Sequence, residues 1–163
     1  MNCKFFGGVV LLIFISSCTS IYNSGYLFDH EIIEETDVIN FSNFVDAIVE
    51  ETNYKAFESV LSTDFVFISQ WTDKTTRREK VLKDVKKVYS ETQRIELGTK
   101  IHEIKIADDG RSARFLIDQP KKRFINGLRW PKESYGMFEV HIIKKDGRLL
   151  ISKLISKREL GKL

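Results

Sequence analysis

Three histidines are the side chains of this chain best suited to proton transfer near neutral pH, and they are His30, His102 and His141. An imidazole serves as a general base when it reaches a bound molecule. His30 lies in an acidic stretch and is expected to be exposed. His102 and His141 lie in strand-like segments, where each is either a general base or an ordinary solvated residue.

Other patterns of catalytic or metal-binding residues are weak or absent. Asp64 and Asp73 bracket a predicted strand and are either an acid–base pair or turn residues beside Ser and Thr. The chain has no His-x-His or His-x-x-x-His pair, and no carboxylate precedes a histidine at helical spacing, so the sequence signal for a metal site is weak. The chain also contains no Gly-rich phosphate loop and no Gly-x-Ser-x-Gly elbow. We therefore expect no metal and no cofactor.

The first 18 residues have the pattern of an export signal. Lys4 precedes the apolar run from Phe5 to Ile15, which is too short to span a bilayer. Ile15-Ser16-Ser17-Cys18 follows and resembles the lipobox of bacterial lipoproteins. This resemblance implies a signal peptide over 1–17 and a lipid attached to Cys18. Residues 18–36 then comprise the lipidated cysteine and a tether. An ordinary secretory signal is the alternative.

Thr19 bears on the destination of the protein. A small polar residue after the lipidated cysteine resembles the outer-membrane class of lipoproteins, so the predicted location is the periplasmic side of the outer membrane. The outer face of the cytoplasmic membrane is the alternative. In either case the chain is anchored by lipid and does not span the membrane.

The remaining residues, 37–163, have the composition of one folded domain. The whole chain has 163 residues, 30% of them charged, and includes 12 Phe, 5 Tyr and 2 Trp, which excludes a disordered chain. Apolar spacing predicts two helices between Thr36 and Leu61, and a strand over 65–68. Thr76 to Glu79 has a capping-box pattern, and it predicts a third helix over about 76–89.

From Gln93 onward the pattern is that of strands alone. The predicted strands are 95–107, 111–118, 134–145 and 148–155, and the turns are Asp109-Gly110 and Asp146-Gly147. Residues 120–131 are predicted to form a protruding hairpin or loop. The order predicts an α+β domain in which N-terminal helices pack on a curved, mainly antiparallel sheet.

This order resembles the nuclear-transport-factor-2-like superfamily, also called the SnoaL-like or cystatin-like cone. The likeness is carried by LSTDFVFISQW after the helix pair, by the turn and helix at 72–79, and by the terminal hairpin around Lys145-Asp146-Gly147. Arg148-Leu149 replaces the tryptophan that is usual after that glycine. A pilotin-like or true cystatin fold is the alternative.

The resemblance implies a conical, largely apolar cavity between the helices and the sheet. The candidates for its polar and aromatic lining are Trp71, His102, Tyr135 and His141. Sheet packing or contact with a partner is the other interpretation of these side chains.

Charge divides the domain into two parts. Residues 28–64 hold ten acidic side chains and one lysine, whereas residues 65–163 hold 24 basic and 13 acidic ones. The candidates for contact with an anionic surface are Lys121, Lys122, Arg123, Arg129 and Lys132. For an exported protein we expect an anionic lipid or an acidic envelope protein as partner, not nucleic acid. A homodimer through the sheet, or a merely solvated strand face, stays open.

The sequence therefore predicts a lipid-anchored envelope protein whose domain binds a protein partner or a small apolar ligand without catalysis. The alternative is a small-molecule isomerase, dehydratase or hydrolase that uses polar residues of the cavity. An envelope assembly component is a third hypothesis, and it is weaker because such proteins are usually held by a spanning helix.

Overall fold

The computed structural model describes residues 26–125, 128–129 and 134–158. The predicted signal peptide, Cys18, Thr19 and the first part of the tether lie outside the described residues. Within the described part, no helix is long and apolar enough to span a membrane. The elements, in chain order, are α2 Glu35–Glu50, α3 Tyr54–Ser59, β1 Leu61–Ser69, β2 Lys74–Arg77, α4 Arg78–Ser90, β3 Arg94–Leu97, β4 Lys100–Ile106, β5 Ser112–Ile125, β6 Leu128–Arg129, β7 Ser134–Lys145 and β8 Arg148–Lys157.

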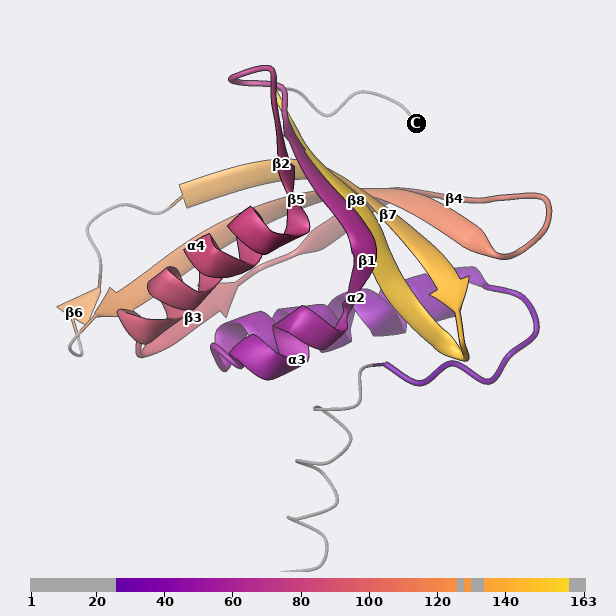
Figure 1. Cartoon of the computed structure of the whole chain (residues 1–163), viewed down its shortest axis with the longest axis horizontal. Helices are drawn as coiled ribbons and strands as arrows, with labels where there is room; N and C mark the ends of the chain where they lie inside the picture. The colour runs from indigo at the N-terminus through magenta and orange to yellow at the C-terminus, as the bar shows by residue number, and fades with distance from the viewer. Residues whose placement is uncertain (1–25, 126–127, 130–133, 159–163) are drawn as a thin grey trace, which may run out of the picture.

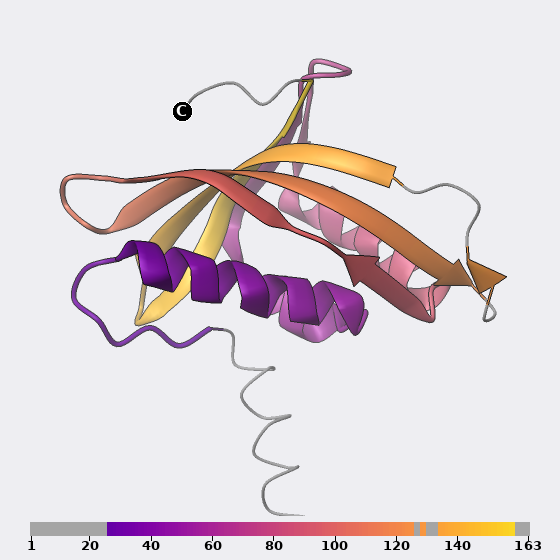
Figure 2. The same ribbon diagram turned by 180° about the vertical axis from the view of Figure 1, so that it is seen from behind.

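The strands form one strongly curved sheet with the helices on its concave side (Figures 1 and 2). The strand order is β2-β1-β8-β7-β5-β3, and β4 and β6 also pair with β5. All pairs are antiparallel except β1 with β8, which run parallel. The prediction of an α+β domain with a mainly antiparallel sheet is therefore confirmed.

Two long strands form the centre of this sheet. β5 and β7 pair over ten residues, from Ser112 with Ile143 to Lys121 with Ser134. β7 then turns into β8 through Asp146 and Gly147, which both have positive φ (51° and 67°). This is the two-residue hairpin that Asp-Gly predicts, since glycine adopts positive φ without a steric penalty.

The start of α4 differs from the capping-box prediction. Thr76 is not the N-cap, because it lies in β2 and pairs with Phe67 of β1. The N-cap is Arg77, whose side chain makes no capping hydrogen bond. The strand pairing of Thr76 holds its backbone extended, so the helix begins only at Arg78.

The strand predicted over 95–107 is two strands. β3 and β4 are separated by Gly98 and Thr99, and both pair with β5. Beside this break lies Pro120, whose carbonyl accepts a hydrogen bond from the Gly98 N–H (3.1 Å). β5 passes through Pro120 to Ile125 and pairs with β6 at its end, so the predicted hairpin extends the sheet.

Residues 26–34 run along the edge of the domain before α2. Phe28 and Ile33 are buried, and the Phe28 N–H donates to the carbonyl of Gly147 (2.8 Å). The Glu34 N–H donates to the Asp37 carboxylate (2.8 Å), which caps the first turn of α2. This part of the predicted tether is thus packed against the start of β8.

The core lies between α2 and the inner face of the sheet. Its fully buried members include Val38, Phe41 and Ile48 of α2, and Ile142 and Leu149 of the sheet. The Phe41 and Phe44 rings both contact the Tyr26 ring, with centroids 5.4 and 5.2 Å apart. The helix pair and the sheet thereby enclose the space in which the candidate site lies.

Candidate ligand cavity

An apolar cavity of about 130 Å³ lies between the three helices and the inner face of the sheet. Its lining is almost entirely aliphatic and aromatic, with contributions from α2, α3, α4, β1, β5, β7 and β8. The apolar members are Phe41, Val45, Val49, Phe57, Leu61, Phe65, Val81, Phe115, Ile117, Phe138, Val140, Ile151 and Leu154. An engineered apolar cavity of about 150 Å³ stays dry and binds benzene, so this volume suits a molecule with a single ring.

Three polar residues, Ser42, Asp46 and Gln119, complete the lining. The Gln119 amide N–H donates to the Asp46 carboxylate (3.3 Å) and to the Thr99 hydroxyl (2.9 Å). The Thr99 hydroxyl in turn hydrogen bonds to Asp46. This closed set of three side chains joins α2 to β5 and to the break between β3 and β4.

Burial raises the pKa of Asp46 above its ordinary value, and the nearby Glu50 carboxylate raises it further. The hydrogen bonds from Thr99 and Gln119 favour the charged form and oppose this rise, but they do not cancel it. Glu50 lies one helical turn after Asp46, and it accepts the Leu97 N–H (2.8 Å). Asp46 is therefore a carboxyl with a raised pKa at the wall of an apolar cavity.

Sequence reasoning missed Asp46, Gln119 and Thr99. A signal for Asp46 was present, because it lies at helical spacing from Ser42 and Val49 on the apolar face of α2. A charged residue on such a face is unusual unless it is paired. Gln119 gave no comparable signal, since it lies in the middle of β5, 73 positions after Asp46.

The four residues proposed from the sequence for the cavity lie elsewhere and are absent from its lining. Trp71 follows β1 in the turn to β2 and is 62% exposed. His102, Tyr135 and His141 lie on the outer face of the sheet, away from the helices. The physical reason is that successive residues of a strand point to opposite faces of the sheet. Ile117 points into the cavity, so the next residue, Asp118, points outward. His102 and Tyr135 contact Asp118 on that outer face.

The outer face nevertheless brings His102 and Tyr135 together. The Tyr135 hydroxyl donates to Asp118 (2.7 Å), and His102 Nε2 lies 3.3 Å from the same carboxylate. Burial raises the pKa of Asp118, but the hydrogen bonds from Tyr135 and His102 outweigh it and leave the pKa below its ordinary value. A β-bulge at His102 turns this ring outward.

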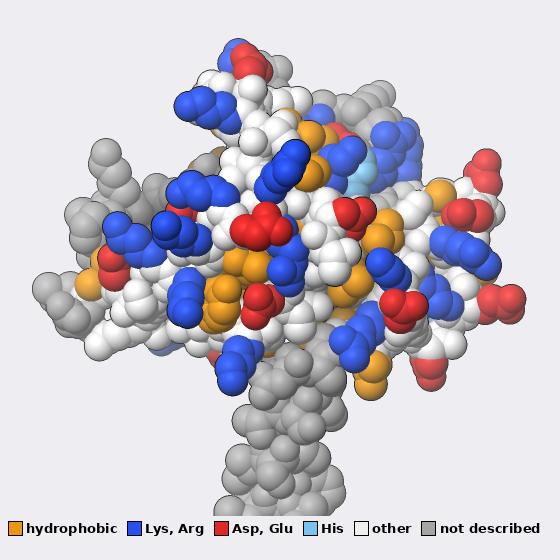
Figure 3. Space-filling view, in the orientation of Figure 1, with side chains coloured by type: hydrophobic (Ala, Val, Ile, Leu, Met, Phe, Trp, Pro, Cys, Tyr) orange, Lys and Arg blue, Asp and Glu red, His pale blue; other side chains and the backbone are white. Residues whose placement is uncertain are grey.

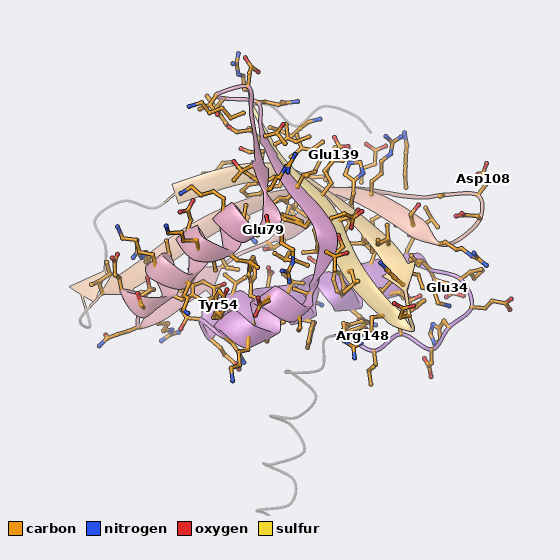
Figure 4. All side chains as sticks on the ribbon, viewed as in Figure 1. Glu34, Tyr54, Glu79, Asp108, Glu139 and Arg148 are labelled. Atoms are coloured by element: carbon orange, nitrogen blue, oxygen red, sulfur yellow. The ribbon has the colours of Figure 1, made fainter. Side chains whose placement is uncertain are left out.

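His141 belongs to a second cluster on this face, in which it contacts Glu139, the residue labelled in Figure 4. Its Nε2 lies 2.8 Å from Glu139, and the Lys157 ammonium lies 2.9 Å from the other oxygen of that carboxylate. Burial raises the pKa of Glu139, but Lys157 and His141 lower it to below the ordinary value. Among the described residues, no three His, Cys, Asp or Glu side chains are placed to hold a metal ion.

Asp64 and Asp73 do not form an acid–base pair in the cavity. Both are exposed, and neither belongs to the cavity lining. Asp73 has a positive φ of 51° in the β1–β2 turn. His30 is also exposed, and its Nδ1 lies 3.3 Å from Asp37.

The basic residues proposed for surface contact differ in their surroundings. Arg123 donates to the Thr92 hydroxyl (2.6 Å) and lies 3.6 Å from Glu91, so it holds the end of α4 against β5. Lys121 is half-buried, and burial, together with Arg123, lowers its pKa. Lys122 is exposed. The Arg129 side chain and Lys132 lie outside the described residues.

Comparison with known proteins relates this chain to others by its fold. No family model matches the sequence, and no curated protein matches it. Solved structures do match. One is an NTF-2-like protein of unknown function from Shewanella oneidensis, with TM-score 0.60 and 20% identity over 74% of this chain and 96% of that one.

Two further matches extend the comparison. A candidate scytalone dehydratase from Novosphingobium aromaticivorans has TM-score 0.64 and 10% identity over 76% of this chain and 82% of that one. A domain of unknown function with a cystatin-like fold from Nostoc punctiforme has TM-score 0.59 and 14% identity over 78% of each chain. This chain therefore has the NTF2-like, cystatin-like cone fold.

Proposed function

We propose that this protein is a lipid-anchored bacterial envelope protein whose cone domain binds a small, mostly apolar molecule with one hydrogen-bonding group. The observation that carries the binding function is the apolar cavity of about 130 Å³ with the Asp46–Gln119–Thr99 set at its wall. Apolar walls with a few placed polar groups are typical of small-molecule sites. The predicted lipid on Cys18 supplies the anchor.

Phenol is a suitable probe, because it combines one ring with one hydroxyl. Titration of the full-length chain in neutral detergent should give saturable changes in the amide spectra of residues along α2 and β5. Val45→Phe should abolish these changes by filling the cavity, and the smaller Val45→Leu should weaken them. Ile39→Phe is the matched control, because Ile39 lies on the same helix and is 43% exposed. Binding that survives in a folded Val45→Phe chain would contradict the cavity site.

The anchor is tested separately. A Cys18→Ser chain should remain uncleaved and should lack the acyl groups that partition the parent into the outer-membrane fraction. Mass spectrometry of the N-terminal peptide measures both effects. Normal processing and lipid content in Cys18→Ser would exclude a lipoprotein, whatever the cavity binds.

The second candidate function is proton-transfer catalysis by an isomerase or dehydratase. It is favoured by Asp46, a carboxyl whose pKa is raised by burial in the cavity. The test is conversion of 3-cyclohexenone to its conjugated isomer, which requires removal and return of one proton. Turnover by the parent that is lost in Asp46→Asn would support catalysis. Phenol binding without any turnover of 3-cyclohexenone would support the binding function and contradict the catalytic one.

A further inference from the structure

A second hollow, which we call the basic groove, lies on the side of the domain formed by α3, the start of α4 and the β7–β8 turn. It has a volume of about 710 Å³ and is separate from the apolar cavity except for the shared Leu61. Its lining is Lys55, Glu58, Ser59, Leu61, Thr63, Arg78, Lys145, Asp146, Arg148 and Leu150. In Figure 3, Lys and Arg side chains are interspersed with carboxylates on the face that presents α3 and α4.

Four cations from three parts of the chain line this groove. Lys55 comes from α3, Arg78 from the first residue of α4, and Lys145 and Arg148 from either side of the β7–β8 turn. Two carboxylates, Glu58 and Asp146, line it as well, so cations outnumber anions by two. Within the described residues, none of the four cations forms a salt bridge. Lys145 does lower the pKa of the nearby exposed Asp64 by charge attraction.

Arg78 is the cation of this groove whose position is fixed by a hydrogen bond. Its Nη2 donates to the Glu58 carbonyl (3.1 Å), which fixes the guanidinium between α3 and α4. Its Nε is buried and has no hydrogen-bond partner among the described residues. Because the Nε is buried, a ligand in the groove contacts the rest of the guanidinium, and the Nε–H signal would report that contact indirectly.

We propose that the basic groove binds a phosphate group, with the accessible part of the Arg78 guanidinium and with Lys55, Lys145 and Arg148 as the cations that surround it. Guanidinium groups pair well with phosphate, because their N–H groups match the spacing of its oxygens. The groove volume lies in the usual range of small-molecule sites and leaves room for the rest of a phosphoester.

The place of the groove suggests the source of the phosphate. Residues 26–28 enter the domain beside it, since Leu27 pairs with Arg148 and Phe28 with Gly147. Figure 1 shows this entry at the same end of the molecule as α3 and the start of β8, and Figure 4 labels Tyr54 and Arg148 there. Tyr26 lies eight positions after Cys18, and eight residues reach at most about 28 Å. A lipid headgroup is therefore within reach if Cys18 is anchored.

The experiment uses the full-length chain in dodecyl maltoside, with two probes. One probe is inorganic phosphate, and the other is dihexanoyl phosphatidylglycerol, with dihexanoyl phosphatidylcholine as its zwitterionic counterpart. The readout is the Arg78 Nε–H signal in nitrogen–proton spectra, identified by its loss in Arg78→Lys. We expect this signal to shift on binding, and its exchange with solvent to slow.

Paired variants test the groove itself. Lys55→Gln with Arg148→Gln should weaken binding of either phosphate probe at least tenfold. Lys83→Gln, which removes an exposed charge from α4 outside the groove, should change binding less than twofold. Equal weakening by Lys83→Gln, or an Arg78 signal that neither phosphate probe moves, would overturn the proposal.

The two probes also distinguish the source. At least tenfold tighter binding of phosphatidylglycerol than of inorganic phosphate supports a lipid headgroup, and equal binding supports a free phosphoester. The site does not depend on the apolar cavity, so phenol binding can fail while phosphate binding succeeds. Only the lipid source depends on the proposed anchor.

Discussion

The inner and outer faces of the central strands, β5 and β7, are shielded from solvent in different ways. On the inner face, Phe115, Ile117 and Val140 pack toward the helices and enclose the apolar cavity. On the outer face, Leu116 is equally buried (2% exposed), although none of the described helices lies on that face. Its neighbours across the strands are the carboxylates Glu103 and Glu139. The outer face is therefore covered by long polar side chains that are paired with each other.

This difference shows which face can accept a ligand without losing its own contacts. The outer histidines, His102 and His141, already contact Asp118 and Glu139, so they form part of the polar side-chain layer on the outer face. On the inner face, the Asp46 carboxylate has amide and hydroxyl partners but no cation among the described side chains, and it adjoins empty apolar space. Four predictions test this contrast.

The largest expected effect comes from Phe115→Ala on the inner face. Phe115 is 2% exposed, and loss of such a ring costs about 3–5 kcal/mol of unfolding free energy. Arg114→Ala, its exposed neighbour on the outer face, should change that free energy by less than about 0.5 kcal/mol. Denaturant unfolding measures both. Comparable losses would show that the outer layer contributes as much as the helical core.

The next effect comes from Lys157→Met on the outer face. It leaves the buried Glu139 with His141 alone, and we expect a loss of about 1–3 kcal/mol at neutral pH. The folded pKa of Glu139 is below its ordinary value, so its stabilising effect is present above that value and is lost as pH falls through the folded pKa. The difference in unfolding free energy between the parent and Lys157→Met should therefore disappear in acid.

Lys153→Met is the matched control for that change. Lys153 is the preceding outward lysine of β8, and it forms no ion pair among the described residues. Its variant should unfold like the parent at every pH. If Lys157→Met lowers the unfolding free energy equally at every pH, the lysine stabilises this face through packing of its methylene groups and not through its charge.

Asp46→Asn should raise the stability of the fold, by less than Lys157→Met lowers it. The pKa of Asp46 is raised in the folded state, so the stability linked to its protonated form is lost as pH rises through that pKa. Asparagine keeps the shape without the charge, so the variant should unfold a few degrees above the parent at neutral pH. The difference should vanish in acid. Asp108→Asn, in the exposed β4–β5 turn labelled in Figure 4, should show no such gain.

The smallest effect on folding is expected from Tyr135→Phe. The Tyr135 side chain is exposed, so removal of its hydroxyl should leave the unfolding temperature unchanged. It should instead raise the pKa of Asp118 toward the ordinary value, because one of the hydrogen bonds that lower it is lost. Carboxyl NMR titration measures this change. An unchanged Asp118 pKa would show that the Tyr135 hydroxyl does not lower it, which would leave His102 and Lys100 as the cause.

Local patterns predicted much of the fold. Apolar spacing marked α2 and α3, and Asp146-Gly147 marked the β7–β8 hairpin within one residue. These elements depend on contacts between near neighbours, so the sequence itself carries the information. The start of α4 could not be found in this way, because the pairing of Thr76 with Phe67 is decided nine residues earlier in β1.

The sequence by itself therefore predicted the α+β class and the order of the three helices and the long strands, and the export signal that ends at Cys18 stays a prediction. Only the tertiary structure decided which polar residues meet. Asp46 and Gln119 are 73 positions apart and become neighbours because α2 crosses the inner face of β5. His102 and His141 point away from that space because a strand places alternate residues on opposite faces. Which of those faces the helices cover is fixed by packing between distant elements, and no local pattern records it.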